Sequence, residues 1–518
     1  MVETRTPLLS VQHLCKEFPV ESGVFGKRFS KKSVHAVNDV SFDIYPGETF
    51  GLVGESGCGK STLGRTILQL YHQTYGRTMY YGRSLDDLAP KYVIDTVKNL
   101  KSRRAKLHEL EQKRDKLEAE YAKLSETEQY AKHTELDTAR KLAEDALLDI
   151  TKIVGGFLVV DDLDPVIAAY SKDYGIARKI SALEEKRQAL QVDVDDAQYA
   201  KKTAEEAGKS EKPGQLEKAQ EKLKQCDDQI AARRQQLDAG RQEIEALRRP
   251  YASDPEFQKY EAYRDDGIDL ARLEYNEMRR LRSDMQLIFQ DPYSSLNPRM
   301  SVGQIISEGM QAHNMIKKKD ARMQQLVLNI MDECGLAPYF LHRFPHQFSG
   351  GQRQRIGIAR ALATNPKFVV CDEAVSALDV SIQAQIINLL LDLKEHQNLT
   401  YMFITHDLSV VKYISDRVGV MYLGNMVELA EADEIFHHPI HPYTEALLNA
   451  IPTTDTVGAK ELSILEGDIP SPVNPPKGCK FHTRCKYCTE ICTQVVPAWE
   501  EVRPNHFVAC HHKLEVKE

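Results

Sequence analysis

The stretch GESGCGKS, residues 54–61, constrains the fold of this chain more than any other part of the sequence. Its glycines let the backbone wrap around phosphates, while Lys60 can bridge β- and γ-phosphates and the Ser61 hydroxyl suits Mg²⁺. Loops of this spacing also occur by chance. Here the loop follows the strand-like ETFGLV and opens STLGRTILQL, which has apolar residues at helical spacing. The sequence therefore predicts a strand, a phosphate-binding loop and a helix.

A pair of acidic residues ends the motif FVVCDE, residues 368–373. The four apolar residues before them are typical of a buried parallel strand. Asp372 at the strand end would hold Mg²⁺ through water, and Glu373 would act on the attacking water. Two acids after a strand can also be an ordinary surface turn, so this motif needs the phosphate loop beside it to be informative.

A second glycine-rich motif, FSGGQRQR, occupies residues 348–355. Its Ser-Gly-Gly opens a predicted helix, so backbone N–H groups and the helix dipole form another anion site. Most phosphate-loop enzymes have no second site of this kind. The simplest explanation is that it serves a nucleotide held by another subunit.

Residues from about 83 to 266 differ in composition from the chain on either side, with Lys, Glu, Ala, Leu, Arg and Gln dominating. Apolar residues recur there every seventh position, which places one apolar seam along each helix. We expect two runs, about 92–149 and 176–249, to form an antiparallel coiled-coil hairpin, with Pro213 and Gly214 interrupting the second. One long solvated helix is the alternative, and the apolar link TKIVGGFLVVDDLDPVIAAY is either a turn or a small tip domain. The seam consists of Leu110, Leu117, Leu124, Leu216, Leu223, Ile230, Leu237 and Ile244.

The ends of this insert can be placed in the sequence. Removing it joins Tyr80-Tyr81-Gly82 to Ile268-Asp269-Leu270, which reads as a strand, a glycine turn and a helix. Loop tips accept insertions at little cost to the host fold. We therefore expect one nucleotide-binding domain split into residues 1–82 and 267–440, the helical insert at 83–266, and a small Cys-rich domain at 441–518.

In this order and context, the motifs resemble those of the ATP-binding-cassette (ABC) ATPases, and the resemblance covers nearly everything except the insert. It implies an α/β P-loop nucleotide-binding domain with a RecA-like core, an antiparallel β subdomain and a helical subdomain that carries the FSGGQ signature. Gln290 in IFQDP resembles the family's Gln-loop residue, which contacts Mg²⁺ and senses a transmembrane partner. His406 in ITHDL resembles the switch histidine, and SALD at 376–379 resembles the D-loop.

This resemblance implies a full set of site residues, with positioning and charge stabilisation doing most of the catalysis. The nucleotide would be bound by Gly54, Glu55, Ser56, Gly57, Cys58, Gly59, Lys60, Ser61 and Thr62, with Phe18 as a loose match for the aromatic that stacks on adenine. Mg²⁺ would be held by Ser61, Gln290 and Asp372, and the catalytic residues would be Glu373, His406 and Gln290. A second subunit's ATP would meet Ser349, Gly350, Gly351 and Gln352, and Asp379 would belong to the D-loop.

A finer resemblance is to the ATPase subunits of oligopeptide and dipeptide importers, most of all to their F-type member. It rests on GLVGESGCGKSTLGRTI, MQLIFQDPYSSLNPRMSVGQII and HPYTEALL. It implies ATP hydrolysis that powers peptide import, in a heterodimer with a related ATPase subunit. Two transmembrane permease subunits and, indirectly, an extracytoplasmic substrate-binding protein would complete the assembly at the cytoplasmic face of the membrane. Nickel and other small-solute importers share the pattern, so the solute stays open.

Five cysteines crowd the C-terminus, and in a cytosolic protein such a cluster favours metal binding over disulfides. Cys485 and Cys488 have the spacing of half a zinc site. The resemblance to importer ATPases implies instead a [4Fe–4S] cluster on Cys479, Cys485, Cys492 and Cys510, which we favour over Zn²⁺. Unmetallated thiols or disulfides are the remaining alternative.

Charge and hydropathy limit the other function classes. A net charge of −8 disfavours nucleic-acid binding, whose surfaces are usually basic. No apolar run approaches the ~20 residues of a spanning helix, and MVETRTPLLS does not resemble a secretory signal. A coiled-coil ABC ATPase of DNA maintenance is the rival from another class, but the insert precedes the Gln loop, its helices are short and its tip has no Cys-x-x-Cys. A soluble regulatory ABC protein is a second rival, although such proteins usually carry two cassettes.

Overall fold

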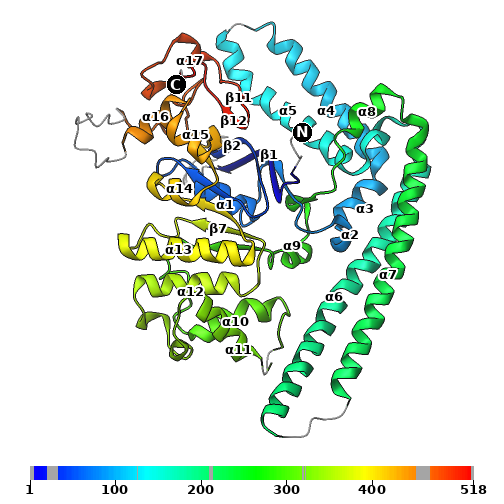
Figure 1. The fold of residues 1–518 in the computed structure, drawn as a ribbon. Coiled ribbons are helices and arrows are strands. Elements are labelled where there is room, and N and C mark those ends of the chain that lie inside the picture. Colours follow the sequence, from blue (N-terminus) through cyan, green and yellow to red (C-terminus); the bar gives the residue numbers. More distant parts are fainter. Residues whose placement is uncertain are drawn as a thin grey trace, which may run out of the picture. The chain divides into compact units, whose positions relative to one another are not determined.

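The computed structural model of this chain describes residues 5–19, 33–124, 126–208, 214–317, 320, 322–450 and 467–514. The chain forms two compact units. The first unit consists of residues 1–78, 281–313 and 324–518, and the second of residues 79–280 and 314–323. Figure 1 shows the elements of both.

An eight-stranded sheet forms the centre of the first unit, in the order β11-β12-β10-β9-β3-β8-β7-β6. Its parallel middle consists of β3 (Thr49–Val53), β7 (Phe368–Asp372) and β8 (Thr400–Ile404), in which every residue is buried. Continuous apolar strands of this kind are covered on both faces. The parallel strands β6 (Met285–Ile288) and β9 (Arg417–Tyr422) flank them.

The C-terminal residues extend this sheet, whereas the sequence suggested a separate small domain from residue 441. Strand β10 (Asn425–Glu431) pairs antiparallel with β9 and β12 (His506–Val508), and β12 pairs with β11 (Glu500–Arg503). A buried carboxylate explains the attachment. Glu428 of β10 accepts hydrogen bonds from the backbone N–H groups of Ile440 (2.6 Å) and His441 (3.1 Å) and lies 2.8 Å from Nε2 of His506. The C-terminal segment therefore shares the core of the first unit.

An antiparallel β subdomain is present, as expected. Strands β1 (Leu9–Pro19) and β2 (Ser33–Ile44) pair antiparallel, and β4 (Tyr75–Tyr80) lies next to β1. The rings of Phe42 in β2 and Phe50 in β3 stack with centroids 4.7 Å apart. This contact joins the subdomain to the central sheet.

Two helices of the first unit begin directly after a serine that caps them. Ser301 and Ser349 each form a capping box with the glutamine three residues later, at the starts of α10 and α12. The helices are α1 (Lys60–Ile67), α10 (Val302–Ala312), α11 (Met323–Glu333), α12 (Gly350–Leu362), α13 (Val380–Gln397), α14 (Leu408–Ile414), α15 (Ala432–His437), α16 (Pro442–Asn449) and α17 (Glu490–Gln494), with short 3₁₀ turns at η4 (Pro338–Phe340), η5 (Pro345–Gln347) and η6 (His482–Arg484).

The second unit is mostly helical. The segments on either side of the insert pair as short strands, whereas the sequence suggested a helix after the glycine turn. Met79 and Tyr80 of β4 pair antiparallel with Asp269 and Ile268 of β5 (Ile268–Asp269). Its helices are α2 (Leu85–Leu88), α3 (Lys91–Lys98), α4 (Leu100–Tyr121), α5 (Glu126–Val154), η1 (Gly155–Val159), α6 (Asp164–Glu206), α7 (Gln215–Arg248), η2 (Arg249–Tyr251), α8 (Pro255–Glu261), η3 (Leu270–Arg272) and α9 (Tyr275–Leu281). None of the helices in the described ranges is long and apolar enough to cross a membrane.

The longest helices, α6 and α7, run antiparallel side by side (Figure 1). Two ion pairs show this, because the residue numbers rise along α6 while they fall along α7: Lys172 lies 2.6 Å from Glu243, and Arg187 lies 2.7 Å from Asp227. The seam expected along α7 is buried at Ile230, Leu237 and Ile244 and half-buried at Leu216 and Leu223. Gly214, at φ 80°, directly precedes α7, and the predicted break at Pro213 lies outside the described residues.

The expected pairing of run 92–149 with run 176–249 differs from the structure, in which each run folds back on itself. Helices α4 and α5 form their own antiparallel pair, with Arg140 bonded to Glu118 at 2.6 Å. The physical reason is that each run contains its own break, after Tyr121 and after Glu206. On α4 the buried residues are Leu100 and Leu107, while Leu110 and Leu117 are half-buried, as is Leu124 just after the helix.

The apolar link between the two helix pairs is neither a simple turn nor a tip. It packs into a core with the start of α4 and the end of α7, so the single solvated helix is excluded. The buried members of this core are Val97, Leu100, Leu107, Ile150, Val154, Phe157, Leu158, Val160, Leu163, Val166, Ala169, Ile244 and Phe257.

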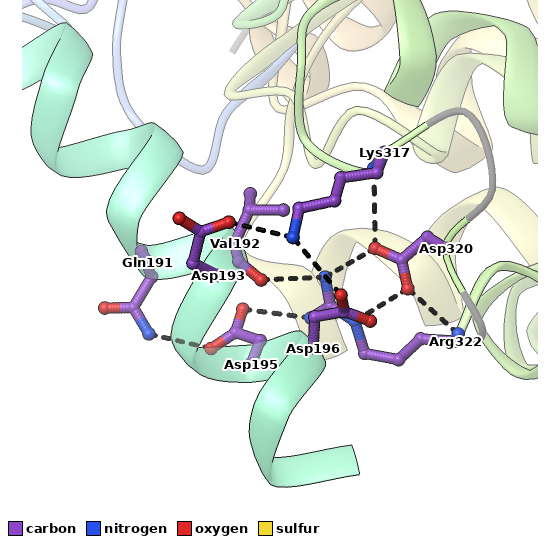
Figure 2. A network of polar contacts seen from close by, with 8 residues as sticks. All are labelled: Gln191, Val192, Asp193, Asp195, Asp196, Lys317, Asp320 and Arg322. Carbon is purple, nitrogen blue, oxygen red and sulfur yellow. Dashed lines mark hydrogen bonds and ion pairs between the residues drawn. The ribbon is translucent and has the colours of Figure 1, made fainter. Parts of the chain in front are cut away.

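One turn of α6 carries an acidic group that binds Lys317 and Arg322, which lie in the connection from α10 to α11 (Figure 2). Nζ of Lys317 lies 2.8 Å from Asp193 and 3.2 Å from Asp196. The guanidinium of Arg322 lies 3.2 Å from Asp195 and 2.8 Å from Asp320. These ion pairs bring the connection into the second unit, although its flanking helices lie mostly in the first.

Candidate nucleotide site

The phosphate loop lies between β3 and α1. Its glycines adopt positive φ angles of 147° at Gly54, 79° at Gly57 and 107° at Gly59, a region in which other residues are strained. Lys60 is buried and donates hydrogen bonds to the carbonyl oxygens of Gly54 (2.7 Å) and Glu55 (3.0 Å). The loop therefore surrounds a fixed positive charge at the start of a helix, which is an anion site.

Two oxygen donors meet beside this loop. The Ser61 hydroxyl donates to Oδ1 of Asp372 at 2.5 Å, and Asp372 is the last, fully buried residue of β7. Arg65 of α1 donates to the other carboxylate oxygen at 3.0 Å. Hard oxygen donors of this kind are what Mg²⁺ prefers, so the residues present fit the cation that the sequence implied.

Three residues from separate motifs converge next to Asp372. Nε2 of Gln290 donates to Oε2 of Glu373 at 2.6 Å, and Nδ1 of His406 lies 3.7 Å from Oε1 of the same carboxylate. Glu373 has φ 48°, a left-handed conformation that costs free energy in a residue other than glycine. Strain of this kind is common at functional sites. The carboxylate is placed where it could orient a water molecule, with an amide and an imidazole beside it.

The signature residues lie at the start of α12, where Ser349 and Gly350 are exposed and Gly351 and Gln352 are half-buried. The Ser349 hydroxyl accepts from the backbone N–H of Gln352 at 3.4 Å, and the Gln352 side chain accepts from the backbone N–H of Ser349 at 3.1 Å. A Cβ built on Gly350 would lie 3.6 Å from Leu378, so this helix start adjoins the SALD segment. Asp379 occupies the N-cap position of α13 without a capping bond from its side chain.

Phe18 lies on β1 and is half-buried. Its ring packs edge-on against Tyr71 with centroids 5.5 Å apart, and the Lys16 ammonium lies 4.7 Å from its centroid. The aromatic is thus part of a small surface cluster, and its stacking on adenine stays a prediction.

The four cysteines implied as cluster ligands gather near one another. The backbone N–H of Cys479 donates to the carbonyl of Cys492 at 2.8 Å. The pKa of the Cys479 thiol is raised to about 11 and that of the Cys510 thiol to about 12, mainly by burial and to a smaller extent by the neighbouring thiols Cys485 and Cys492. All ten cysteines of the chain are free thiols, and Cys488 is exposed. Within the described ranges, no group of three or more His, Cys, Asp or Glu side chains is arranged to hold a metal ion.

Sequence reasoning missed residues that support the loop from elsewhere in the first unit. Both terminal nitrogens of Arg484 donate to the Glu55 carboxylate, at 2.7 and 3.0 Å, and the Tyr443 hydroxyl accepts from the Glu55 backbone N–H at 2.9 Å. The segment HPYTEALL, which contains Tyr443, resembles the importer ATPases but does not by itself predict a contact with the loop. The position of Arg484, just before Cys485 of the cysteine cluster, was the other available signal.

Two family models and several known proteins are similar to this chain. The family model described as ABC transporter matches residues 37–259 and 257–376, and the model described as oligopeptide/dipeptide transporter, C-terminal region, matches residues 427–492. Among solved structures, cbiO1 from Clostridium perfringens matches with a TM-score of 0.41 and 16% identity, covering 83% of this chain and 91% of that one.

Curated relatives match about half of this chain and about three quarters of their own length. The oligopeptide transport ATP-binding protein AppF of Bacillus subtilis is 52% identical over 250 residues, which is 47% of this chain and 75% of the relative. The oligopeptide transport ATP-binding protein OppF of Salmonella typhimurium is 52% identical over 247 residues, 47% of this chain and 73% of the relative. A putative peptide import ATP-binding protein of Brucella ovis is 53% identical over 245 residues, 47% and 77% respectively. The chain belongs to the ATP-binding subunits of the ABC transporter family, an ATPase family.

Proposed function

We propose that this protein is the ATP-hydrolysing subunit that powers a peptide importer. The observation that carries the proposal is the meeting of Gln290, Glu373 and His406 beside the Ser61–Asp372 pair. The names of the relatives, which refer to oligopeptide transport and peptide import, supply the substrate class.

A task can be proposed for each residue. The backbone of residues 54–62 and the Lys60 ammonium would hold the β- and γ-phosphates. Ser61, Gln290 and, through water, Asp372 would hold Mg²⁺, which supplies positive charge for the phosphate oxygens. Glu373 would orient the attacking water, and His406 would stabilise the γ-phosphate. Because phosphoryl transfer needs little covalent chemistry, this positioning accounts for most of the proposed catalysis.

The exposed signature start would complete the site of a second subunit. Ser349, Gly350, Gly351 and Gln352 present a capped helix start in the first unit, which suits a γ-phosphate held by a partner. The partner proposed is a related ATPase subunit. Two permease subunits and an extracytoplasmic binding protein would complete the importer, with this protein peripheral at the cytoplasmic face of the membrane.

Replacing the proposed catalytic carboxylate tests this function. Glu373→Gln should keep ATP binding, lower ATP turnover by about 100-fold or more and accumulate an ATP-bound dimer. Glu395→Gln is the matched control, because Glu395 is exposed on α13 away from these contacts, and its turnover should equal that of the unmodified protein. Undiminished turnover in Glu373→Gln would remove Glu373 from the mechanism.

The solute requires a separate measurement. Permease subunits should co-purify with this protein, and uptake of labelled peptides by the reconstituted importer should depend on it. Uptake of nickel without uptake of peptides would assign the chain to the small-solute importers that share this pattern.

The iron–sulfur cluster on Cys479, Cys485, Cys492 and Cys510 stays a proposal. In its favour, Cys479, Cys485 and Cys492 lie close enough to Cys510 to raise the pKa of its thiol. The described side chains do not form a ready-made ligand set, so no step of hydrolysis is routed through a cluster. Anaerobically purified protein should be brown and contain iron and sulfide in equal amounts. The Cys488→Ser variant should have the same colour and the same iron and sulfide content. A colourless protein with one zinc would replace the cluster by the zinc alternative.

A further inference from the structure

The phosphate loop is held from outside by the C-terminal segment of the first unit. Arg484 makes a two-pronged ion pair with the Glu55 carboxylate, with N–O distances of 2.7 and 3.0 Å. Pairs with this fork geometry fix orientation as well as charge. The Arg484 side chain is only 5% exposed and that of Glu55 is 22% exposed, so solvent screens the pair weakly.

Arg484 is itself held in place by a buried aromatic group. The rings of Tyr422, Tyr443 and Phe481 pack with centroids 4.8 to 5.3 Å apart, and the Arg484 guanidinium lies 6.0 Å from the centroid of Tyr422. The Arg484 backbone N–H donates to the carbonyl of Phe481 at 3.0 Å. Because both the backbone and the guanidinium of Arg484 are held in place, Arg484 can fix the position of the Glu55 carboxylate.

The Glu55 backbone is fixed from the same direction. Its N–H donates to the hydroxyl of Tyr443, which is fully buried on α16. Its carbonyl accepts from the Lys60 ammonium. Side chain, N–H and carbonyl of this single loop residue are therefore all engaged, two of them by the segment after residue 440.

The charge of Glu55 makes its pairing relevant to ligand binding. The carboxylate belongs to a loop that wraps a polyanion, and like charges placed close together repel. Arg484 cancels this charge. Without Arg484, an unpaired carboxylate would remain in the loop and would be free to turn toward the phosphates.

We propose that Arg484 is a positioning residue of the nucleotide site, which neutralises and orients Glu55 so that the phosphate loop binds a nucleoside triphosphate. The inference rests on the proposed function of the loop. It makes the segment after residue 440 part of the nucleotide site, and it needs no metal at the neighbouring cysteines.

A charge-removal series on the full-length protein tests the proposal. Arg484→Met should raise the Kd for ATP by about 10-fold or more, and raise KM for ATP with kcat at saturation changed less than about 3-fold. Adding Glu55→Gln to Arg484→Met should recover at least half of the lost affinity on a logarithmic scale, because the unpaired carboxylate is gone. Arg484→Lys should weaken binding by about 3-fold or more, since it keeps the charge and loses the fork.

The matched control is Lys486→Met, two residues further on. Lys486 pairs with Glu445 of α16 at 2.9 Å instead of with the loop, so its loss should leave the Kd for ATP unchanged. A double variant that binds ATP as weakly as Arg484→Met would show a purely structural role and overturn the proposal. If Arg484→Met does not fold, Arg484→Lys decides, and affinity equal to that of the unmodified protein overturns the proposal.

A further variant separates this inference from the proposed function. Lys60→Ala removes the ammonium inside the loop and should abolish ATP binding. If Lys60→Ala no longer binds ATP while Arg484→Met binds ATP with full affinity, the inference about Arg484 is refuted and the proposed function is not. Full affinity in Lys60→Ala would refute the nucleotide site itself.

Discussion

The glycines of the phosphate loop differ in why they are needed, and alanine substitutions should separate the reasons. At Gly57, with φ 79°, an added Cβ would have no heavy atom within 4 Å. At Gly59, with φ 107°, an added Cβ would lie 2.1 Å from the backbone oxygen of Ala36 in β2. The first substitution strains only the residue itself, whereas the second also forces two backbone segments apart.

The two costs can be worked out separately. A left-handed conformation costs an alanine about 1 kcal/mol relative to glycine. Overpacking against atoms that cannot move freely adds about 1–3 kcal/mol. We therefore expect the free energy of unfolding to fall by about 1 kcal/mol in Gly57→Ala and by about 2–4 kcal/mol in Gly59→Ala.

The single tryptophan of the chain gives a suitable signal for this measurement. Trp499 stacks on Phe507 of β12 with ring centroids 5.9 Å apart, so its fluorescence reports on the sheet of the first unit. Urea unfolding of both variants, followed by this fluorescence, gives the difference in unfolding free energy. Equal losses, or a larger loss in Gly57→Ala, would refute the steric argument at Gly59.

Three further changes test other parts of the molecule. Burial raises the pKa of Asp173 from 3.8 to about 6, so the stability that its carboxyl contributes is fully present below pH 3.8 and is lost as the pH rises through 6. Asp173→Asn should remove this pH dependence. After allowance for solvent screening, the variant should be more stable at pH 7 by about 1 kcal/mol in thermal unfolding of the second unit followed by circular dichroism. Glu428→Gln should lower the free energy of unfolding by about 3 kcal/mol in the urea experiment, because two buried N–H groups and His506 lose a charged acceptor. Arg322→Ala should speed hydrogen exchange of the amides of residues 314–317 and 320 without changing exchange in α7.

Exposed residues of the same types serve as controls for these three. Asp238→Asn, Glu431→Gln and Arg249→Ala should each leave the corresponding measurement unchanged. An unchanged pH profile in Asp173→Asn would show that its carboxyl is solvated, and unchanged stability in Glu428→Gln would show that the amide replaces the carboxylate. Unchanged exchange in Arg322→Ala would mean that other contacts hold residues 314–317 and 320.

The sequence could predict the parts of the site that local chemistry specifies. A buried apolar strand places its terminal acid at the sheet edge, which is where Asp372 meets Ser61 of the loop after β3. Removing the helical segment places Tyr80 near Ile268 in the sequence, but the sequence suggested a helix after the turn instead of the observed strand pairing. Parallel strands bring their carboxyl ends together, so motifs separated by some three hundred residues could still be placed beside one another.

Partners that depend on tertiary packing could not be predicted in this way. A heptad seam at Ile230, Leu237 and Ile244 shows which face of α7 is buried, but not which helix covers it. For that reason the sequence suggests that the two helical runs pack against each other, whereas in the structure each run folds back on itself. The ion pair of Arg484 with Glu55 joins residues 429 positions apart and leaves no periodic pattern.

The helical insert is more than a spacer grown from a turn. A spacer needs support only at its own ends, which the pairing of Met79 and Tyr80 with β5 provides. One acidic turn of α6 also forms ion pairs with Lys317 and Arg322, in the connection from α10 to α11. Arg322 is largely buried there, so withdrawing its carboxylate partners would leave a poorly solvated charge. The connection between α10 and α11 therefore cannot rearrange without either breaking these ion pairs or moving together with α6.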